Sequence, residues 1–594
     1  MVGVLIVLIG IAGALSLKTV KDAKDELTQA KDLLAQVADN PSSLLNHSGR
    51  TSDSLALNQA ESLANKADAQ LRSSASLGFV GLFPVLHTQR NGALQLASDA
   101  GTAAGLARGL VSDIDGLASS TSLQGGQVPL TSLAKLEQAA AKATSTMASL
   151  QRGSGGLLPP LNQARDLFDK TAAKVSARLN NAASDLSAAR TFMGADGGRT
   201  YLVIGENNAE MRDQGMALSY STVTFSSGRF QTGPSADTGS IEPTAPVDVP
   251  IPAGTQAMFG GLQPTSLWQS TNATADFPWS ASVMSAMYKQ VTSAQVDGVI
   301  AVDVPAISQL LAVTGPVSVP GIATTLTSSN VADILLNQLY ASSPTSNQQA
   351  TRRDEVAAAT SAILSVLKNG SSTDIVDLGN ALAKSASGGH LMLWSSHPQE
   401  EKIFEHTGLG GDISSSDPQR TIHVAVENAT ATKLDYFIQP TVTVNVTLTS
   451  FGTAIINTKV QLDNQAPVGA AASYQLGPDG VNSFVPGQYV GRIYFWGPSV
   501  GVQPGSVPES GLRLNQTPLK VDAGQMGSVS FSTSVPDAVQ NGTLRLRFVP
   551  QPRLFPDHLI VNLNAPSWRV SSGSRQVSVS WDTTTSIQWG LSSK

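Results

Sequence analysis

The chain has no cysteine, few charged residues and no excess of basic ones. Without thiols it cannot form disulfide bonds, Cys-ligated zinc sites, iron–sulfur clusters or a cysteine nucleophile. Charged residues make up 14% of the sequence, against roughly 25% in an average soluble protein. The net charge is −6, from 38 Lys and Arg against 44 Asp and Glu, whereas a nucleic-acid-binding domain normally carries a basic surface. We therefore expect no nucleic-acid partner.

Histidine and aromatic residues are also sparse. None of the seven His residues lies three or four positions from another, so no helix presents a His pair to a metal ion. We assign no metal ligands and disfavour a metal-dependent hydrolase. Aromatic residues are 5% of the chain and hydrophobic residues 41%, so the cores must consist mainly of Ala, Leu, Val and Ile. A length of 594 residues corresponds to about four domains.

The first seventeen residues, Met1–Leu17, contain no charged side chain. As a helix they would span about 26 Å, slightly less than a hydrocarbon core of roughly 30 Å. Three interpretations compete: a membrane anchor, a cleavable signal peptide ending near Ala12-Gly13-Ala14, and a buried core helix. The Lys and Asp residues that follow disfavour the core helix. We expect a single-pass anchor in the cell membrane, with the bulk of the chain extracytoplasmic, because long domains translocate largely regardless of nearby charge.

The remaining chain divides into three regions by its hydrophobic pattern. Residues 18–197 show helical spacing, as in Leu27, Ala30, Leu34 and Val37, and predict a helical stalk or bundle. Residues 198–417 mix short apolar runs with amphipathic helices and predict an α/β domain. In it, Val299–Val302 is an expected strand, and Asp303 is expected to cap the next helix. Residues 418–594 alternate with period two from Arg420 on and predict a β-sandwich of one or two modules.

The segment Arg199–Phe230 (RTYLVIGENNAEMRDQGMALSYSTVTFSSGRF) resembles the domain-of-unknown-function family 4012 of bacterial membrane-anchored proteins. The similarity continues in Leu267–Gln290 and Asp297–Gly321, and returns in KLDYF (Lys433–Phe437) and LDNQAP (Leu462–Pro467). The resemblance covers most of the chain, including the anchor and the helical stalk, and the motifs are specific when taken in this order. One departure from the family pattern is Asp213-Gln214-Gly215-Met216, where a Thr-Gly-Gly-like stretch is usual after the Glu-x-Arg.

The central region is also distantly similar to the LytR-CpsA-Psr domain, whose enzymes transfer glycopolymers from a polyprenyl-pyrophosphate carrier to peptidoglycan. This resemblance places Arg212-Asp213 at the Arg/Asp loop, Gly315-Pro316-Val317 at the stop, and Arg352-Arg353-Asp354 on the Arg-bearing helix. The usual Arg-x-Arg is missing from Tyr340–Ser343. The predicted fold class is thus multidomain α+β: an N-terminal membrane helix (1–17), a helical stalk, a central α/β domain resembling LytR-CpsA-Psr, and C-terminal β-sandwich material.

The candidate site combines these residues. On helical spacing Arg352 shares a face with Val356, Ala359 and Ile363, and an inward-facing Arg is either paired with a carboxylate or binds an anion. In the functional interpretation Arg212, Asp213, Arg352 and Arg353 are the catalytic candidates, and Glu206, Asn207 and Glu210 are ligand-binding. No cofactor is certain, although Glu206, Glu210 or Asp213 could hold Mg²⁺, since hard cations take oxygen ligands.

Three functions follow from these resemblances. We favour a cell-envelope protein with a binding or scaffolding role in glycopolymer assembly, whose ligand would be a polyprenyl-phosphate lipid or a cell-wall glycan. The first alternative is an active polyprenyl-pyrophosphate-dependent glycopolymer transferase, which needs little beyond Arg and Mg²⁺ to position and neutralise phosphates. The second is a purely adhesive surface protein that acts through its β region. The missing Arg-x-Arg favours the binding or scaffolding role.

Overall fold

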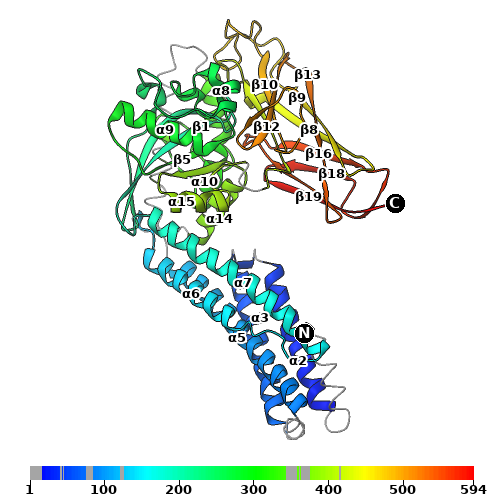
Figure 1. Cartoon of the computed structure of the whole chain (residues 1–594). Coiled ribbons are helices and arrows are strands. Elements are labelled where there is room, and N and C mark those ends of the chain that lie inside the picture. The colour runs from blue at the N-terminus through cyan, green and yellow to red at the C-terminus, as the bar shows by residue number, and fades with distance from the viewer. Residues whose placement is uncertain are drawn as a thin grey trace. The chain divides into compact units, whose positions relative to one another are not determined.

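The computed structural model describes residues 17–40, 43–44, 46–74, 84–120, 126–342, 358–359, 362, 365, 375–413 and 417–594. The chain forms two compact units, shown in Figure 1. The first unit consists of the helices that precede Gly197, with a short segment, Ser372–Asp377, and the second contains the rest.

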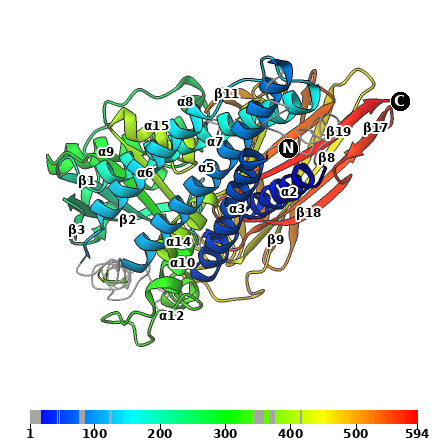
Figure 2. The ribbon, with the colours of Figure 1, turned by 90° about the horizontal axis from the view of Figure 1, so that it is seen from below.

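The first unit is all helical, as its spacing predicts. The long helices among its described residues are α2 (Leu17–Asp39), α3 (His47–Ser73), α5 (Pro84–Ser120), α6 (Leu130–Ser149) and α7 (Pro159–Phe192). Helix α3 packs between α2 and α5, and α6 packs along α7 (Figure 2). The contact faces are rich in alanine, with Ala60, Ala64 and Ala67 of α3 fully buried. Such small side chains allow close approach, but each buries little apolar area.

No helix in the described part of the chain, which begins at Leu17, is both long and apolar enough to cross a membrane. The N-terminal membrane helix in the predicted fold class is therefore wrong for this structure. Helix α2 instead carries Lys and Asp side chains along its length, which are costly in hydrocarbon. The other residues of the predicted anchor, 1–16, lie outside the described residues.

The second unit begins with a mixed sheet in which β1 and β5 run parallel, and the strand order is β3-β2-β1-β5-β6 with β4 on β2. The predicted strand at Val299–Val302 is confirmed, as part of β5. The strands are β1 (Arg199–Asn207), β2 (Met216–Ser226), β3 (Arg229–Thr232), β4 (Ala236–Asp237), β5 (Gly298–Asp303) and β6 (Leu391–Ser395).

Helices cover both faces of this sheet. Helix α9 (Phe277–Thr292) packs on one face through Met284 and Met287. Helix α10 (Val304–Thr314) packs on the opposite face, near the C-terminal end of β5. Asp303 caps α10 as predicted, accepting a hydrogen bond from the amide of Ala306 at 3.0 Å. The shorter helical elements are α8 (Ala253–Phe259), α11 (Val331–Asp333), the π-helix Ile334–Gln338, α12 (Leu339–Ser342), α14 (Ile375–Ser387), α15 (Pro398–Thr407), and the 3₁₀ turns Thr238–Ile241, Gly260–Leu262, Trp268–Ser270 and Leu434–Phe437.

The C-terminal part is a sandwich of two sheets, an eight-stranded one (β11-β12-β10-β7-β15-β19-β17, with β14 on β15) and a five-stranded one (β13-β9-β8-β16-β18). One core fills the space between the sheets. Its strands are β7 (Thr421–Asn428), β8 (Ile438–Leu448), β9 (Ala454–Asn464), β10 (Tyr489–Gly497), β11 (Val507–Glu509), β12 (Leu512–Val521), β13 (Met526–Val535), β14 (Val539–Gln540), β15 (Thr543–Val549), β16 (Asp557–Asn564), β17 (Trp568–Ser572), β18 (Gln576–Trp581) and β19 (Thr585–Ser593).

Strand β7 is buried on both faces. Its alternate side chains Ile422, Val424 and Val426 point into the sandwich core, whereas Ala425 packs in a second cluster with Phe259 of α8. The α/β part therefore covers the outer face of the eight-stranded sheet where β7, β10 and β12 meet α8 and its neighbours.

Candidate functional site

The end of β1 and the loop that joins it to β2 carry five of the seven predicted site residues. Strand β1 ends in an irregular register at Gly205-Glu206, and the chain returns to β2 through Gly215. Gly215 has a φ of 124°, and a Cβ there would lie 3.3 Å from Cβ of Glu206. The loop is thus folded tightly onto the end of its own strand. The carboxylates of Glu206, Glu210 and Asp213 are buried, and a buried charge is stable only when it has a partner.

Glu210 forms an ion pair with Lys433, from the turn that follows β7. The two residues are 6% and 1% exposed. The ammonium also lies 5.3 Å from the ring centre of Tyr340 and 5.9 Å from that of Tyr474. Burial alone would lower the pKa of Lys433, but the negative charge of Glu210 raises it above its usual value. Lys433 is therefore charged, and Glu210 is its counter-ion.

Asp213 pairs with His423 of β7, with 2.7 Å between Oδ1 and Nε2. The other ring nitrogen of His423 lies 2.9 Å from the carbonyl oxygen of Val549. Gln214 donates a hydrogen bond to the second oxygen of Asp213 at 2.6 Å. Burial disfavours the charged imidazole, yet the charge and hydrogen bond of Asp213 raise the pKa of His423 above its usual value. Both ring nitrogens then act as donors.

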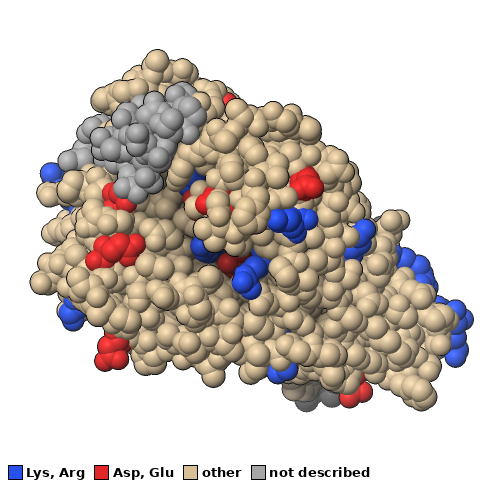
Figure 3. All heavy atoms as spheres, turned by 90° about the horizontal axis from the view of Figure 1, so that it is seen from above, with Lys and Arg blue, Asp and Glu red and all other residues tan. Residues whose placement is uncertain are grey.

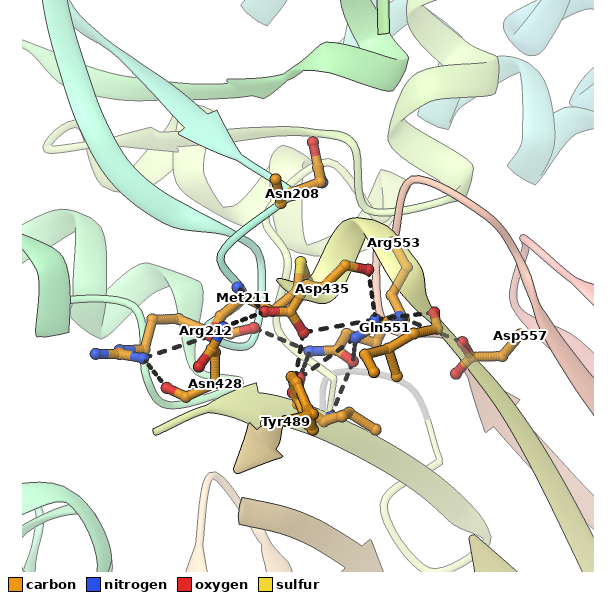
Figure 4. A network of polar contacts seen from close by, with 12 residues as sticks. Asn208, Met211, Arg212, Asn428, Asp435, Tyr489, Gln551, Arg553 and Asp557 are labelled. Atoms are coloured by element: carbon orange, nitrogen blue, oxygen red, sulfur yellow. Dashed lines mark hydrogen bonds and ion pairs between the residues drawn. The ribbon is translucent and has the colours of Figure 1, made fainter. Parts of the chain in front are cut away.

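Arg212 binds backbone atoms of the sandwich (Figure 4). Its Nη1 donates to the carbonyl oxygen of Asn428 at 2.6 Å, and its own carbonyl accepts from Nε2 of Gln551 at 2.9 Å. The neighbouring amide of Met211 donates to Asp435 at 3.0 Å. Arg212 thus lies between the two parts of the unit, and its Nε is buried without a hydrogen-bond partner.

Glu206 and Asn207, predicted as ligand-binding residues, also have protein partners. Asn272 donates to Glu206 at 2.9 Å, and Asn207 donates to the hydroxyl of Tyr340 at 2.9 Å. Burial, and secondarily the charges of Asp303 and Asp213, hold the pKa of Glu206 well above its usual range. Within the described ranges, no group of three His, Asp or Glu side chains could hold a metal ion.

Further buried charges that the sequence analysis missed surround this loop. Asp435 accepts from the hydroxyl of Tyr489 at 2.9 Å and from the side-chain amide of Asn428 at 2.9 Å. Arg553 lies between Asp435 and Asp557, 3.6 Å from an oxygen of each (Figure 4). Lys433 and Asp435 belong to the KLDYF motif, and this motif was the sequence signal that could have identified them as part of the site. Arg553 precedes β16 and Asp557 begins it, in a segment that carries no such signal.

A second His–Asp pair, in which only the Asp is fully buried, was also missed. Nδ1 of His390 lies 2.6 Å from Asp303, which accepts a further bond from Asn208 at 2.8 Å. Arg352 and Arg353, the other two catalytic candidates, lie outside the described residues. The structure therefore brings Glu206, Asn207, Glu210, Arg212 and Asp213 together. It pairs the last three with residues of the C-terminal part, and the first two with Asn272 and Tyr340 of the α/β part.

Two further features, a tryptophan that could stack on a sugar ring and a Gly-x-Ser-x-Gly stretch, have structural explanations. Trp268 is fully buried, with its indole N–H donating to Ile241 at 2.9 Å, so packing rather than sugar stacking explains it. The Gly497–Gly501 stretch is a turn closed by a 2.7 Å hydrogen bond from Gly501 to Pro498, and it is not followed by the helix that a nucleophile elbow needs.

Comparison with known proteins gives a family match. Residues 196–340 match the family described as protein of unknown function (DUF4012). No curated protein and no solved structure shows significant similarity to the chain, so the similarity to the LytR-CpsA-Psr domain is not shown. The match begins just before β1 and includes the whole β1–β2 loop with its buried charges. Over residues 196–340, the chain is thus similar to the DUF4012 family.

Proposed function

We propose that this protein is a non-catalytic binding or scaffolding component of the cell envelope, acting in glycopolymer assembly. One observation carries the non-catalytic part of the proposal. The acidic and basic side chains that a transferase would direct at a phosphate and a metal ion are instead buried against partners in the protein, as in Glu210 with Lys433 and Asp213 with His423.

Pairing of this kind disfavours phosphoryl-type transfer for a physical reason. That chemistry depends on cations and metal ions that neutralise charge on the transferred group. Arg212 donates to a main-chain carbonyl, and the carboxylates beside it are buried. The glycopolymer part of the proposal rests on the sequence resemblance, which supplies the ligand class of a polyprenyl-phosphate-linked glycan.

The test is a transfer assay with the purified full chain, a polyprenyl-pyrophosphate-linked glycan and a peptidoglycan acceptor, with and without Mg²⁺. We expect saturable binding of the lipid-linked glycan and no transfer. Transfer that is lost in Arg212→Lys, at an unchanged melting temperature, would overturn the proposal. Arg545→Ala is a matched control, since this Arg is on β15, in the same sheet as β7, and its side chain is 52% exposed.

A further inference from the structure

Two loops at one end of the β-sandwich expose large apolar side chains. The segment 465–488, which joins β9 to β10, carries four of them, and a fifth begins β13. Their exposed fractions lie between 54% and 77%. We call this set the apolar apex, and its members are Val468, Val481, Phe484, Val485 and Met526. Single exposed apolar residues are ordinary on protein surfaces, but a cluster of them marks contact with an apolar partner.

Contacts between the two loops bring the apolar apex together. A Cβ on Gly524, in the turn between β12 and β13, would lie 2.7 Å from Cγ2 of Val468, and Met526 follows two positions later. Lys520 of β12 places its Nζ 5.5 Å from the ring centre of Phe484. Figure 3 shows the molecule from above, the side on which these gold-coloured loops lie in Figure 1, and charged side chains are sparse there. Both loops thus contribute to one largely uncharged surface.

The longer loop is held in place by hydrogen bonds of its own polar groups. Asp479 accepts from the amides of the residues at 481, 482 and 483 at 2.6–3.1 Å. The side chain of Asn482 donates to the carbonyl of Ala429, just after β7, at 2.6 Å, and the amide of Gly487 donates to Leu476 at 2.8 Å. These polar groups are satisfied within the protein, whereas the apolar side chains of the same loop face outward. This is the reverse of an ordinary surface loop, and it keeps the apolar side chains available to a partner.

Charged groups beside the apolar apex are complementary to a zwitterionic phospholipid headgroup. Lys520 and Arg492 are exposed on the adjacent strands β12 and β10, and such cations bind phosphate oxygens. Two carboxylates balance them: Asp479, bound to main-chain amides, and Asp522, which accepts from Gln488 at 2.7 Å. A lysine can also lay its stem along apolar groups while its ammonium stays among polar ones. These four charges cancel, so attraction to the surface of a bilayer would depend on the apolar side chains.

We propose that the apolar apex docks on the surface of a phospholipid bilayer. Val481, Phe484 and Val485 enter the boundary between headgroups and acyl chains, and Lys520 stays at the level of the phosphates. Apolar side chains gain free energy when they leave water for hydrocarbon, and a fluid bilayer receives side chains from loop tips without a matching groove. A protein partner would need a complementary surface. The inference goes beyond the proposed function and does not depend on it, because it rests on loops of the β-sandwich alone.

The experiment places a fluorescent label at a known position of the full chain. Since the sequence has no cysteine, Val485→Cys takes a single label. Phe451→Cys is the matched control, because Phe451 is 89% exposed in the turn between β8 and β9, at the other end of β9 from the apolar apex. The vesicles are phosphatidylcholine with brominated acyl chains, which quench a label that enters the hydrocarbon. Each label reports its own surroundings, so attachment of another segment to the vesicle does not by itself give the signal.

We expect quenching of the label at position 485 and none at 451, at low and at high salt, since screening has little effect on a contact without net charge. Adding Phe484→Ser to the Val485→Cys protein should raise the vesicle concentration for half-maximal quenching at least about tenfold, or about 1.4 kcal/mol. The exposed position of Phe484 should leave the melting temperature unchanged, and Phe451→Ser should leave the quenching unchanged.

Three results would each overturn the inference: no quenching at 485, equal quenching at 485 and 451, or quenching that requires an anionic lipid in the vesicles. Self-association that is lost in Phe484→Ser, without quenching by vesicles, would also overturn it and would assign the apolar apex to contact with a second copy of the chain.

Discussion

Glu210 and Lys433, 223 positions apart in the sequence, form a buried ion pair between the β1–β2 loop and the turn after β7. Neither residue has bulk water to solvate it, since they are 6% and 1% exposed. The pair joins the DUF4012 region to the β-sandwich, and it explains why a loop of charged residues can be buried at this interface.

Replacing one member of this pair should be far more costly than replacing both. In Lys433→Met the carboxylate of Glu210 is left buried without its counter-ion, and we expect a loss of about 3–5 kcal/mol in the free energy of unfolding. The double variant Lys433→Met/Glu210→Met should lose much less than the sum of the two single changes. Denaturant titration of the four proteins measures the coupling, and simple additivity would show that the two charges do not interact.

The stability of the second unit should decrease as the pH rises from about 4 to 7. Burial raises the pKa of Asp557 to about 7, against the opposing charges of Arg553 and His423. A group whose pKa is raised in the folded state contributes stability below its unfolded pKa and loses it as the pH rises to the folded pKa. Each pKa unit by which the folded and unfolded states differ changes the free energy of unfolding by about 1.4 kcal/mol. Asp557→Asn should flatten this slope in unfolding curves recorded across the range, and an unchanged slope would exclude Asp557 as its source.

His423 should titrate above its ordinary value of 6.5. Because the raised pKa comes from Asp213, the stabilisation that it represents is complete below pH 6.5 and is lost as the pH rises through the folded pKa. Nuclear magnetic resonance of the His423 ring measures this value directly. In Asp213→Asn the pKa should fall below 6.5, since burial then acts without the carboxylate; a value unmoved by this change would contradict the pairing.

The docking of α8 on β11 depends on one glycine. A Cβ on Gly254 would lie 1.8 Å from the carbonyl oxygen of Pro508, so Gly254→Ala must move the helix away from the strand. We expect a loss of about 1–3 kcal/mol, as for other overpacked sites, measured as a lower melting temperature. Gly261→Ala is the matched control, because nothing lies within 4 Å of its Cβ position, and an equal loss there would show a general effect of alanine.

Local signals in the sequence identify elements well. Strand β8 alternates because only one face meets a core, with Val442, Val444 and Val446 buried. The capping of α10 by Asp303 also depends only on neighbouring residues. Strand β7 shows the same period two at Thr421–Val426, yet it is buried throughout, because Phe259 and its neighbours, far upstream, cover the second face. Periodicity cannot reveal such a partner.

The same limit applies to the candidate site. The sequence placed Glu206, Asn207, Glu210, Arg212 and Asp213 in one loop, and the structure does bring them together. The sequence could not indicate that Lys433, His423 and Asn428 contact these residues, since the contacts join positions more than 200 residues apart. A charged loop resembles an open site until the partners that neutralise it are known.

The most direct test of the structural role of this loop is amide hydrogen exchange in wild type and Lys433→Met. If the charged loop holds the DUF4012 region on the β-sandwich, protection should fall together in residues 206–216, in 429–437 and along β7. Loss of protection confined to 429–437, with the loop and β7 unchanged, would contradict this structural role. The charged residues of the loop would then be catalytic candidates again.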